Sequence, residues 1–177
     1  MAMQDIASAM QRVEQVLRRR PEAGIHDDPP ATARWESGMR VVASHPNGTQ
    51  MPTDMPVQLG GSGDQVTPGW LLRAGLASCA ATLIAMAAAA EGIELTVLEV
   101  LAKIRSDTRG LLGMANAEGT PINAGPSDVQ LHVRISARAV APERLRALVE
   151  DAQRCSPVPN ALQNAVPVAL RIEVDSH

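Results

Sequence analysis

The fold of this chain is decided by the stretch Thr67-Pro68-Gly69-Trp70-Leu71-Leu72-Arg73-Ala74-Gly75-Leu76-Ala77-Ser78-Cys79. It begins as helices begin, because a Thr67 side chain can accept a hydrogen bond from a first-turn amide and Pro68 has no N–H to leave unpaired. Small apolar residues then continue to Glu91-Gly92, where a glycine can end the helix. We therefore predict one long, buried central helix that carries Cys79.

The composition limits how the core is built and what the protein binds. The 177 residues suit one domain, and 45% of them are apolar, although Trp35 and Trp70 are the only aromatic residues. Small aliphatic side chains bury less area each, so extensive contact or oligomerisation has to compensate. A net charge of -3 with no aromatic stacking platform argues against a nucleic-acid partner.

The long apolar run from Ala74 to Ala90 is the one segment that resembles a membrane span. It consists mostly of Ala, Gly, Ser, Cys and Thr, and Arg73 and Glu91 lie at its ends, so its transfer into lipid is only weakly favourable. We expect a core helix and no membrane partner. The N-terminus shows no signal-peptide pattern, and two cysteines without an export signal are typical of the reducing cytoplasm.

The chain divides into an N-terminal segment, residues 1–30, and a main domain, residues 31–177. Residues 4–20 show the periodicity of an amphipathic helix, and Pro21 together with the prolines after Asp28 ends it in a linker. Residues 33–59 predict a short meander that turns at Pro46-Asn47-Gly48. The loop Gly60-Gly61-Ser62-Gly63-Asp64 lacks the lysine of a phosphate-binding loop, so we interpret it as mobile.

Three later segments alternate like strands, and two segments predict further helices. The predicted strands are residues 97–105, 129–137 and 168–174, with a long hairpin loop over 106–127. Pro142 begins a helix that runs to about Arg154, and Ser156-Pro157 has the pattern of a cap and first residue of a short helix. The fold class is therefore α+β, with antiparallel sheets around the buried central helix.

Cys79 is the first candidate for chemistry. It lies about 16 Å from the start of its helix at about 1.5 Å per residue, too far for the helix dipole to ionise its thiol. A reactive Cys79 would need a nearby cation, and the available ones are Arg40, Arg34 and Arg73. The alternative is an inert, small core residue, because free cysteines are often buried.

Cys155 lies at a junction between two predicted helices, where unpaired amides could stabilise a thiolate, although a passive cysteine is equally consistent with the pattern. Ser156 is most simply an N-cap. The four histidines are scattered, so no metal-ligand spacing exists, and no serine-hydrolase motif is present. We expect neither a metal nor another cofactor.

Residues 33–174 resemble the OsmC family of osmotically inducible and organic-hydroperoxide-resistance proteins. The resemblance is carried by Pro-x-x-Leu-Leu-x-Ala-x-x-Ala-Ser-Cys at Pro68–Cys79, by the Glu91-Gly92-Ile93 helix exit, and by Ser156-Pro157-Val158 where the family usually has Cys-Pro-Val. It implies an intertwined homodimer with active thiols at the subunit interface. It also implies reduction of organic hydroperoxides in oxidative-stress defence, with a thiol reductant as the second substrate.

By position, the resemblance makes Cys79 the peroxidatic cysteine, Arg40 the activating arginine and Cys155 the nearest equivalent of the resolving cysteine. Two departures matter: Gly69 stands where the family has a glutamate, and Ser156 stands where it has the resolving cysteine. Three readings therefore stay open. They are a two-cysteine peroxidase, a peroxidase resolved by an external thiol, and a non-catalytic protein that binds a small apolar ligand at the dimer interface.

Overall fold

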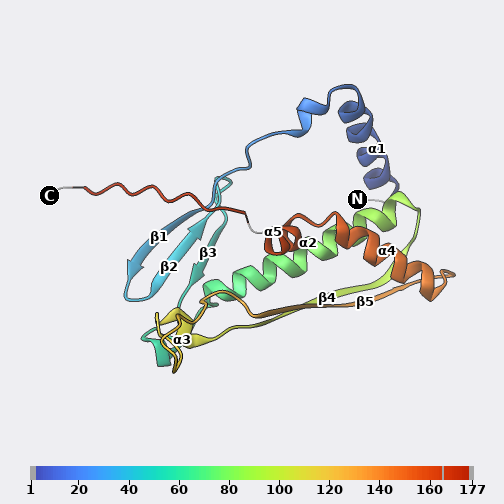
Figure 1. The fold of residues 1–177 in the computed structure, drawn as a ribbon. Helices are drawn as coiled ribbons and strands as arrows, with labels where there is room; N and C mark the ends of the chain where they lie inside the picture. Colours follow the sequence, from blue (N-terminus) through green and yellow to red (C-terminus); the bar gives the residue numbers. More distant parts are fainter. Residues whose placement is uncertain (1–2, 165, 176–177) are drawn as a thin grey trace.

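The computed structural model describes residues 3–164 and 166–175. Antiparallel strands and helices confirm the α+β class, and Figure 1 shows their arrangement. In chain order the elements are α1 (Met3–Arg19), η1 (Pro21–Gly24), β1 (Thr32–Ser37), β2 (Arg40–Ser44), β3 (Gln50–Thr53), η2 (Val57–Leu59), α2 (Pro68–Ala90), β4 (Leu95–Arg105), α3 (Thr108–Leu111), β5 (Asp128–Ala137), α4 (Pro142–Arg154) and α5 (Pro157–Gln163).

The central helix α2 begins as the sequence predicts. Thr67 Oγ1 accepts a hydrogen bond from the Trp70 amide at 3.2 Å, and Pro68 occupies the first turn. The helix ends before Gly92, whose φ of 66° lies in the left-handed region that favours glycine. Figure 1 shows α2 running through the middle of the molecule, where it packs against β4, α4, α1 and α5.

Residues four apart form the buried stripe of α2: Leu76, Ala80, Ile84 and Ala88 are almost fully covered. Ala88 joins the core cluster with Ile93, Leu145 and Leu148. Among the described residues, α2 is the one helix long and apolar enough to cross a membrane. Its contacts with four other elements favour a core helix instead.

Two antiparallel sheets flank this helix. The predicted meander is confirmed as β1-β2-β3, and the chain reverses at residues 45–49, where the His45 amide donates to Thr49 O. The second sheet is the long hairpin β4-β5, which packs on α2. The first sheet stands at the opposite end of Figure 1 from α1, and every residue of β1 is exposed.

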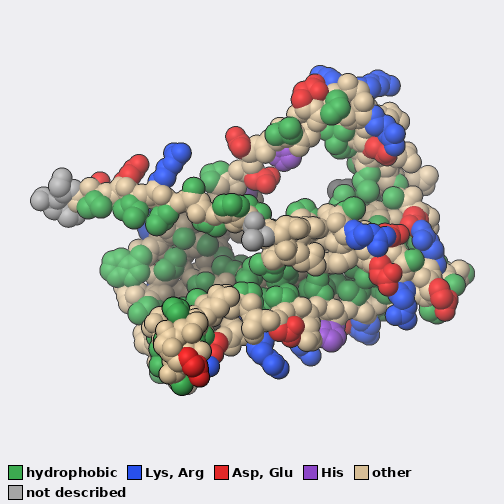
Figure 2. All heavy atoms as spheres, viewed as in Figure 1, with side chains coloured by type: hydrophobic (Ala, Val, Ile, Leu, Met, Phe, Trp, Pro, Cys, Tyr) green, Lys and Arg blue, Asp and Glu red, His purple; other side chains and the backbone are tan. Residues whose placement is uncertain are grey.

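The strand predicted over residues 168–174 is wrong for a single copy of the chain. Residues 166–175 are extended without strand pairing, and the segment leaves the body of the molecule in Figures 1 and 2. Its alternate apolar side chains are exposed: Val168 93%, Leu170 82%, Ile172 74% and Val174 85%. A strand needs a neighbouring edge for its N–H and C=O groups, and this segment meets none within the described part of the chain.

Candidate functional site

Cys79 and Ser156 meet at the centre of the candidate site. The Cys79 thiol, on the middle of α2, lies 3.2 Å from the Ser156 hydroxyl oxygen, at the junction of α4 and α5. Cys79 is half-buried, whereas Ser156 is fully buried with an exposed fraction of 0%. The fold therefore joins the two sequence segments that carried the resemblance, although they are 77 residues apart.

The backbone holds Ser156 firmly in this position. Its conformation is extended, as a residue before proline prefers, because the ring of Pro157 disfavours the helical region. The side-chain amide nitrogen of Asn160, Nδ2, donates to Ser156 O at 2.9 Å and to Arg154 O at 3.1 Å. Ser156 occupies the predicted N-cap position of α5, but its side chain makes no capping bond because the hydroxyl points at Cys79.

Cys155 lies next to Ser156 in the sequence but in a different environment. It is the C-cap of α4 and its side chain is exposed, while the Ser156 side chain faces the thiol of Cys79. The fold thus brings Ser156, and not Cys155, into hydrogen-bonding contact with Cys79. A resolving role for Cys155 stays a prediction.

Arg40, on β2, is held by two carboxylates that precede the Pro68–Cys79 motif in the sequence. Its Nη2 lies 3.1 Å from Asp54 Oδ2 and 2.5 Å from Asp64 Oδ1, and it donates to Ser62 Oγ at 3.0 Å. Asp54 is buried and also accepts from the Met55 amide at 2.7 Å. We call Arg40, Asp54, Ser62 and Asp64 the arginine cluster.

The arginine cluster fixes the loop that the sequence suggested is mobile. Ser62 Oγ lies 2.6 Å from both Asp54 and Asp64, and its hydrogen bond is the main cause that lowers the pKa of Asp54 from 3.8 to about 2. A side chain at Gly61 would lie 1.9 Å from Met55 O, so the loop closes only with glycine there. The contacts of Asp54, Ser62 and Asp64 with Arg40 join residues 14 to 24 positions apart, so sequence reasoning missed them.

The predicted pairing of Cys79 with an arginine does not occur within one copy of the described chain. Neither Arg40, Arg34 nor Arg73 donates a hydrogen bond to the thiol, whose partner among the described residues is Ser156. The Nε of Arg40 is buried and has no partner in that part of the chain. A role for Arg40 at the thiol therefore stays a prediction.

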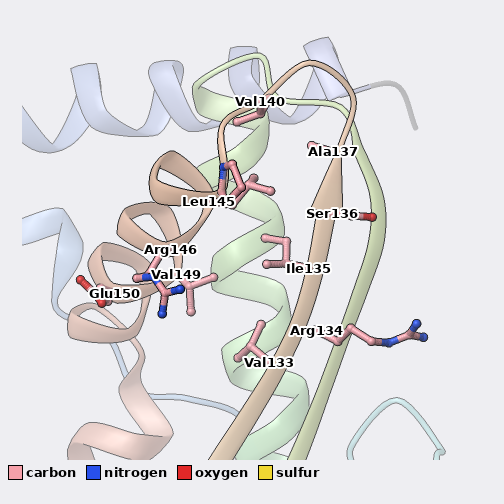
Figure 3. A pocket seen from close by; sticks show the side chains of 11 residues that line it. Val133, Arg134, Ile135, Ser136, Ala137, Val140, Leu145, Arg146, Val149 and Glu150 are labelled. Carbon is pink, nitrogen blue, oxygen red and sulfur yellow. The ribbon is translucent and has the colours of Figure 1, made fainter.

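A separate cavity of about 680 Å³ lies between β5 and α4. Figure 3 shows Val133, Ile135, Leu145 and Val149 pointing into it, whereas Arg134 and Ser136 point to the opposite face of β5. This alternation follows from the two-residue period of a strand. Arg146 and Glu150 also line the cavity, and Cys79 does not.

Residues 61–171 match the model of the OsmC-like protein family, which is more than half of the chain. The chain belongs to the OsmC family. This match includes both Cys79 and Ser156, and it leaves α1 outside. Within the described residues, no group of three His, Cys, Asp or Glu side chains is arranged to hold a metal ion.

Solved OsmC-family structures share the fold at low identity. An OsmC-like protein from Mycoplasma pneumoniae is 18% identical with a TM-score of 0.65, over 80% of this chain and 91% of that chain. An organic hydroperoxide resistance protein from Elizabethkingia anophelis, crystallised with thiocyanate, is 24% identical with a TM-score of 0.60 and the same coverage. A search of curated protein sequences gives no match.

Proposed function

We propose that this OsmC-family protein reduces organic hydroperoxides and that Cys79 is the nucleophile. The observation that carries the proposal is the 3.2 Å contact between Cys79 Sγ and the fully buried Ser156 hydroxyl. The contact joins the thiol of the helix motif to Ser156, the first residue of the Ser156-Pro157-Val158 segment where the family usually has Cys-Pro-Val. Related structures described as organic hydroperoxide resistance proteins, such as that from Elizabethkingia anophelis, support the same chemistry.

In this reaction the Cys79 thiolate attacks one peroxide oxygen. An S–O bond forms as the O–O bond breaks, and the leaving alkoxide takes up a proton to become an alcohol. Cys79 becomes a sulfenic acid, which a thiol reductant must return to the thiol. The α2 helix that carries Cys79 is mostly apolar in sequence, which suits an alkyl hydroperoxide better than a polar one. Two free cysteines are consistent with a cytoplasmic location.

We propose a homodimer as the working form, with residues 1–30 as an addition to the OsmC-like domain of 31–177. Two observations support the dimer: β1 is exposed along its whole length, and the alternating apolar residues of 168–174 lack a neighbouring strand. A second copy would supply an edge for that segment. In this proposal Arg40 acts on Cys79 only in the assembled dimer, since no arginine donates a hydrogen bond to the thiol within the described residues of one copy.

The oligomeric state is tested by the mass of the protein in solution, measured by light scattering after size exclusion. We expect twice the 18.7 kDa of one chain. The double variant Leu170→Asp, Ile172→Asp should shift the mass toward that of one chain, and Arg171→Asp, on the alternate side of the segment, is the matched control. A wild-type protein that elutes with the mass of a single chain at all concentrations contradicts the dimer.

A second function, binding of a small apolar ligand without catalysis, has specific support. Gly69 cannot supply the carboxylate that the family places there, and the Nη2 of Arg40 is already occupied by Asp54 and Asp64. Without a positioned cation, Cys79 would only line a pocket. The two functions differ in whether hydroperoxide is consumed.

The experiment that separates them follows hydroperoxide concentration in the presence of reduced protein and an added thiol. Peroxidase activity predicts catalytic loss of cumene hydroperoxide and slower loss of hydrogen peroxide. Cys155→Ser reports whether the second thiol is needed for either loss. If cumene hydroperoxide persists at the rate of a protein-free control, the ligand-binding function replaces the proposal.

A further inference from the structure

The position next to the reactive thiol is filled by a hydroxyl, and this determines how the oxidised thiol can be reduced. Ser156 is fully buried and its side chain is directed at Cys79 Sγ. A hydroxyl cannot form a disulfide, so the residue in contact with Cys79 cannot resolve a sulfenic acid. The second thiol, Cys155, belongs to the preceding residue and is exposed.

For Cys155 to take the position of Ser156 beside Cys79, the junction between α4 and α5 would have to open. The junction is held by the Cys155 amide donating to Ala152 O at 3.1 Å and by the Asn160 side chain donating to Arg154 O and Ser156 O. Pro157 also restricts Ser156 to the extended region. A disulfide needs its two Cα atoms within about 7 Å and its Cβ atoms directed toward each other. Cys155 is exposed instead.

We propose that Cys79 acts as a one-cysteine peroxidatic thiol whose sulfenic acid is resolved by a low-molecular-weight monothiol and not by Cys155. This inference rests on the proposed function. The monothiol sulfur forms an S–S bond with Cys79 while the sulfenic S–O bond breaks, and the hydroxyl takes up the monothiol's proton and leaves as water. A second monothiol attacks the mixed disulfide, which releases the Cys79 thiol and a symmetric disulfide. A small thiol suits the site because Cys79 is half-buried in the middle of α2, against α5.

The first arm of the test asks, without peroxide, whether the Cys79 thiol can form a disulfide with a thiol at position 155 or at position 156. Reduced wild type, Cys155→Ser, Ser156→Cys and Ser156→Ala are treated with the thiol oxidant diamide, and disulfides are mapped by non-reducing peptide mass spectrometry. We expect no disulfide between Cys79 and Cys155 in wild type, but a disulfide between Cys79 and the introduced thiol of Ser156→Cys. A Cys79–Cys155 disulfide in wild type, within one copy or between two, overturns the inference.

The second arm adds cumene hydroperoxide with glutathione as the monothiol probe. We expect one glutathione on Cys79 as the trapped intermediate, and turnover of Cys155→Ser within about twofold of wild type. Loss of turnover in Cys155→Ser, or turnover with a dithiol protein but not with glutathione, overturns the inference. If Cys79 stays unmodified by the hydroperoxide, the proposed function fails and the resolving step fails with it. The diamide results can still be as expected in that case, because they test only which thiols can reach Cys79.

Discussion

The arginine cluster and the Cys79 site differ in how many hydrogen-bond and ion-pair partners their side chains have. Arg40 contacts two carboxylates and a hydroxyl, and buried Asp54 accepts from both side chain and backbone. Cys79, by contrast, has one neutral partner, Ser156, among the described residues. Dense pairing of this kind stabilises a loop, whereas a half-buried thiol with a single hydroxyl partner stays available for reaction. Within one copy of the chain the first region closes a loop, and we place the nucleophile in the second.

The largest effect in this comparison is expected from Cys79→Ser. A hydroxyl of similar size keeps the contact with Ser156 but is a poor nucleophile toward a peroxide, so cumene hydroperoxide consumption should fall on the order of 1000-fold or more. The free energy of unfolding should change little. The check is steady-state peroxide consumption together with urea unfolding of the same preparation. Retained consumption in a folded variant removes Cys79 from the mechanism.

The next effect concerns the loop of the arginine cluster. Gly61→Ala places a methyl group 1.9 Å from Met55 O and 2.6 Å from Asp54 Oδ1, so backbone must shift. Overpacking of this kind costs about 1–3 kcal/mol in the free energy of unfolding, measured by urea titration. Gly75→Ala is the matched control, because its methyl group meets open space in a regular helix and should stabilise by about 0.5–1 kcal/mol. Equal stability of the two variants would contradict the close approach.

Acid should weaken the arginine cluster. The Ser62 hydrogen bond, followed by the Met55 and Ser62 amides and Arg40, holds the folded pKa of Asp54 at about 2, below its usual 3.8. A carboxyl with a lowered folded pKa stabilises the protein above its unfolded pKa, and that contribution is lost as pH falls from about 4 to about 2. Ser62→Ala removes the largest cause, so urea midpoints measured across this range should fall less steeply than in wild type. Parallel profiles for the two proteins would count against the cluster.

The smallest effect is expected at Gly69. A side chain there makes ordinary contacts of 3.8 Å with Arg73 Nη1 and Thr67 Oγ1, so it fits without rearrangement. Gly69→Glu adds a carboxylate at the N-terminus of α2 and an i,i+4 pair with Arg73, worth about 0.5–1 kcal/mol in unfolding free energy. Gly69→Gln separates the charge from the loss of glycine. If the glutamine variant is as stable as the glutamate one at low salt, the charge contributes nothing.

Local chemistry made much of the fold predictable. Thr67 and Pro68 marked the start of α2, Pro142 marked α4, and Ser156-Pro157 marked α5, because capping and proline geometry act within a few residues. The meander β1-β2-β3 followed from alternation and a turn. The strand over 168–174 has the same alternation, but pairing depends on a partner edge that a pattern cannot supply.

The candidate site was less predictable because its contacts join distant residues. The sequence identified Cys79, but its contact with Ser156 spans 77 positions and reverses the expected use of that serine as a cap. The arginine cluster likewise joins β2 to a glycine-rich loop more than 20 residues later. A one-residue difference between Cys155 and Ser156 decides which side chain faces Cys79, and only the packed junction of α4 and α5 resolves it.

The most direct test of the central claim is the chemical state of Cys79 after one equivalent of cumene hydroperoxide is added to fully reduced protein. Peptide mass spectrometry with a sulfenic-acid trap would measure it over seconds to minutes. We predict that Cys79 carries the trapped sulfenic acid, that Cys155 remains a thiol, and that the peroxide is consumed in proportion. A Cys79 that remains a free thiol while the hydroperoxide persists would contradict the account.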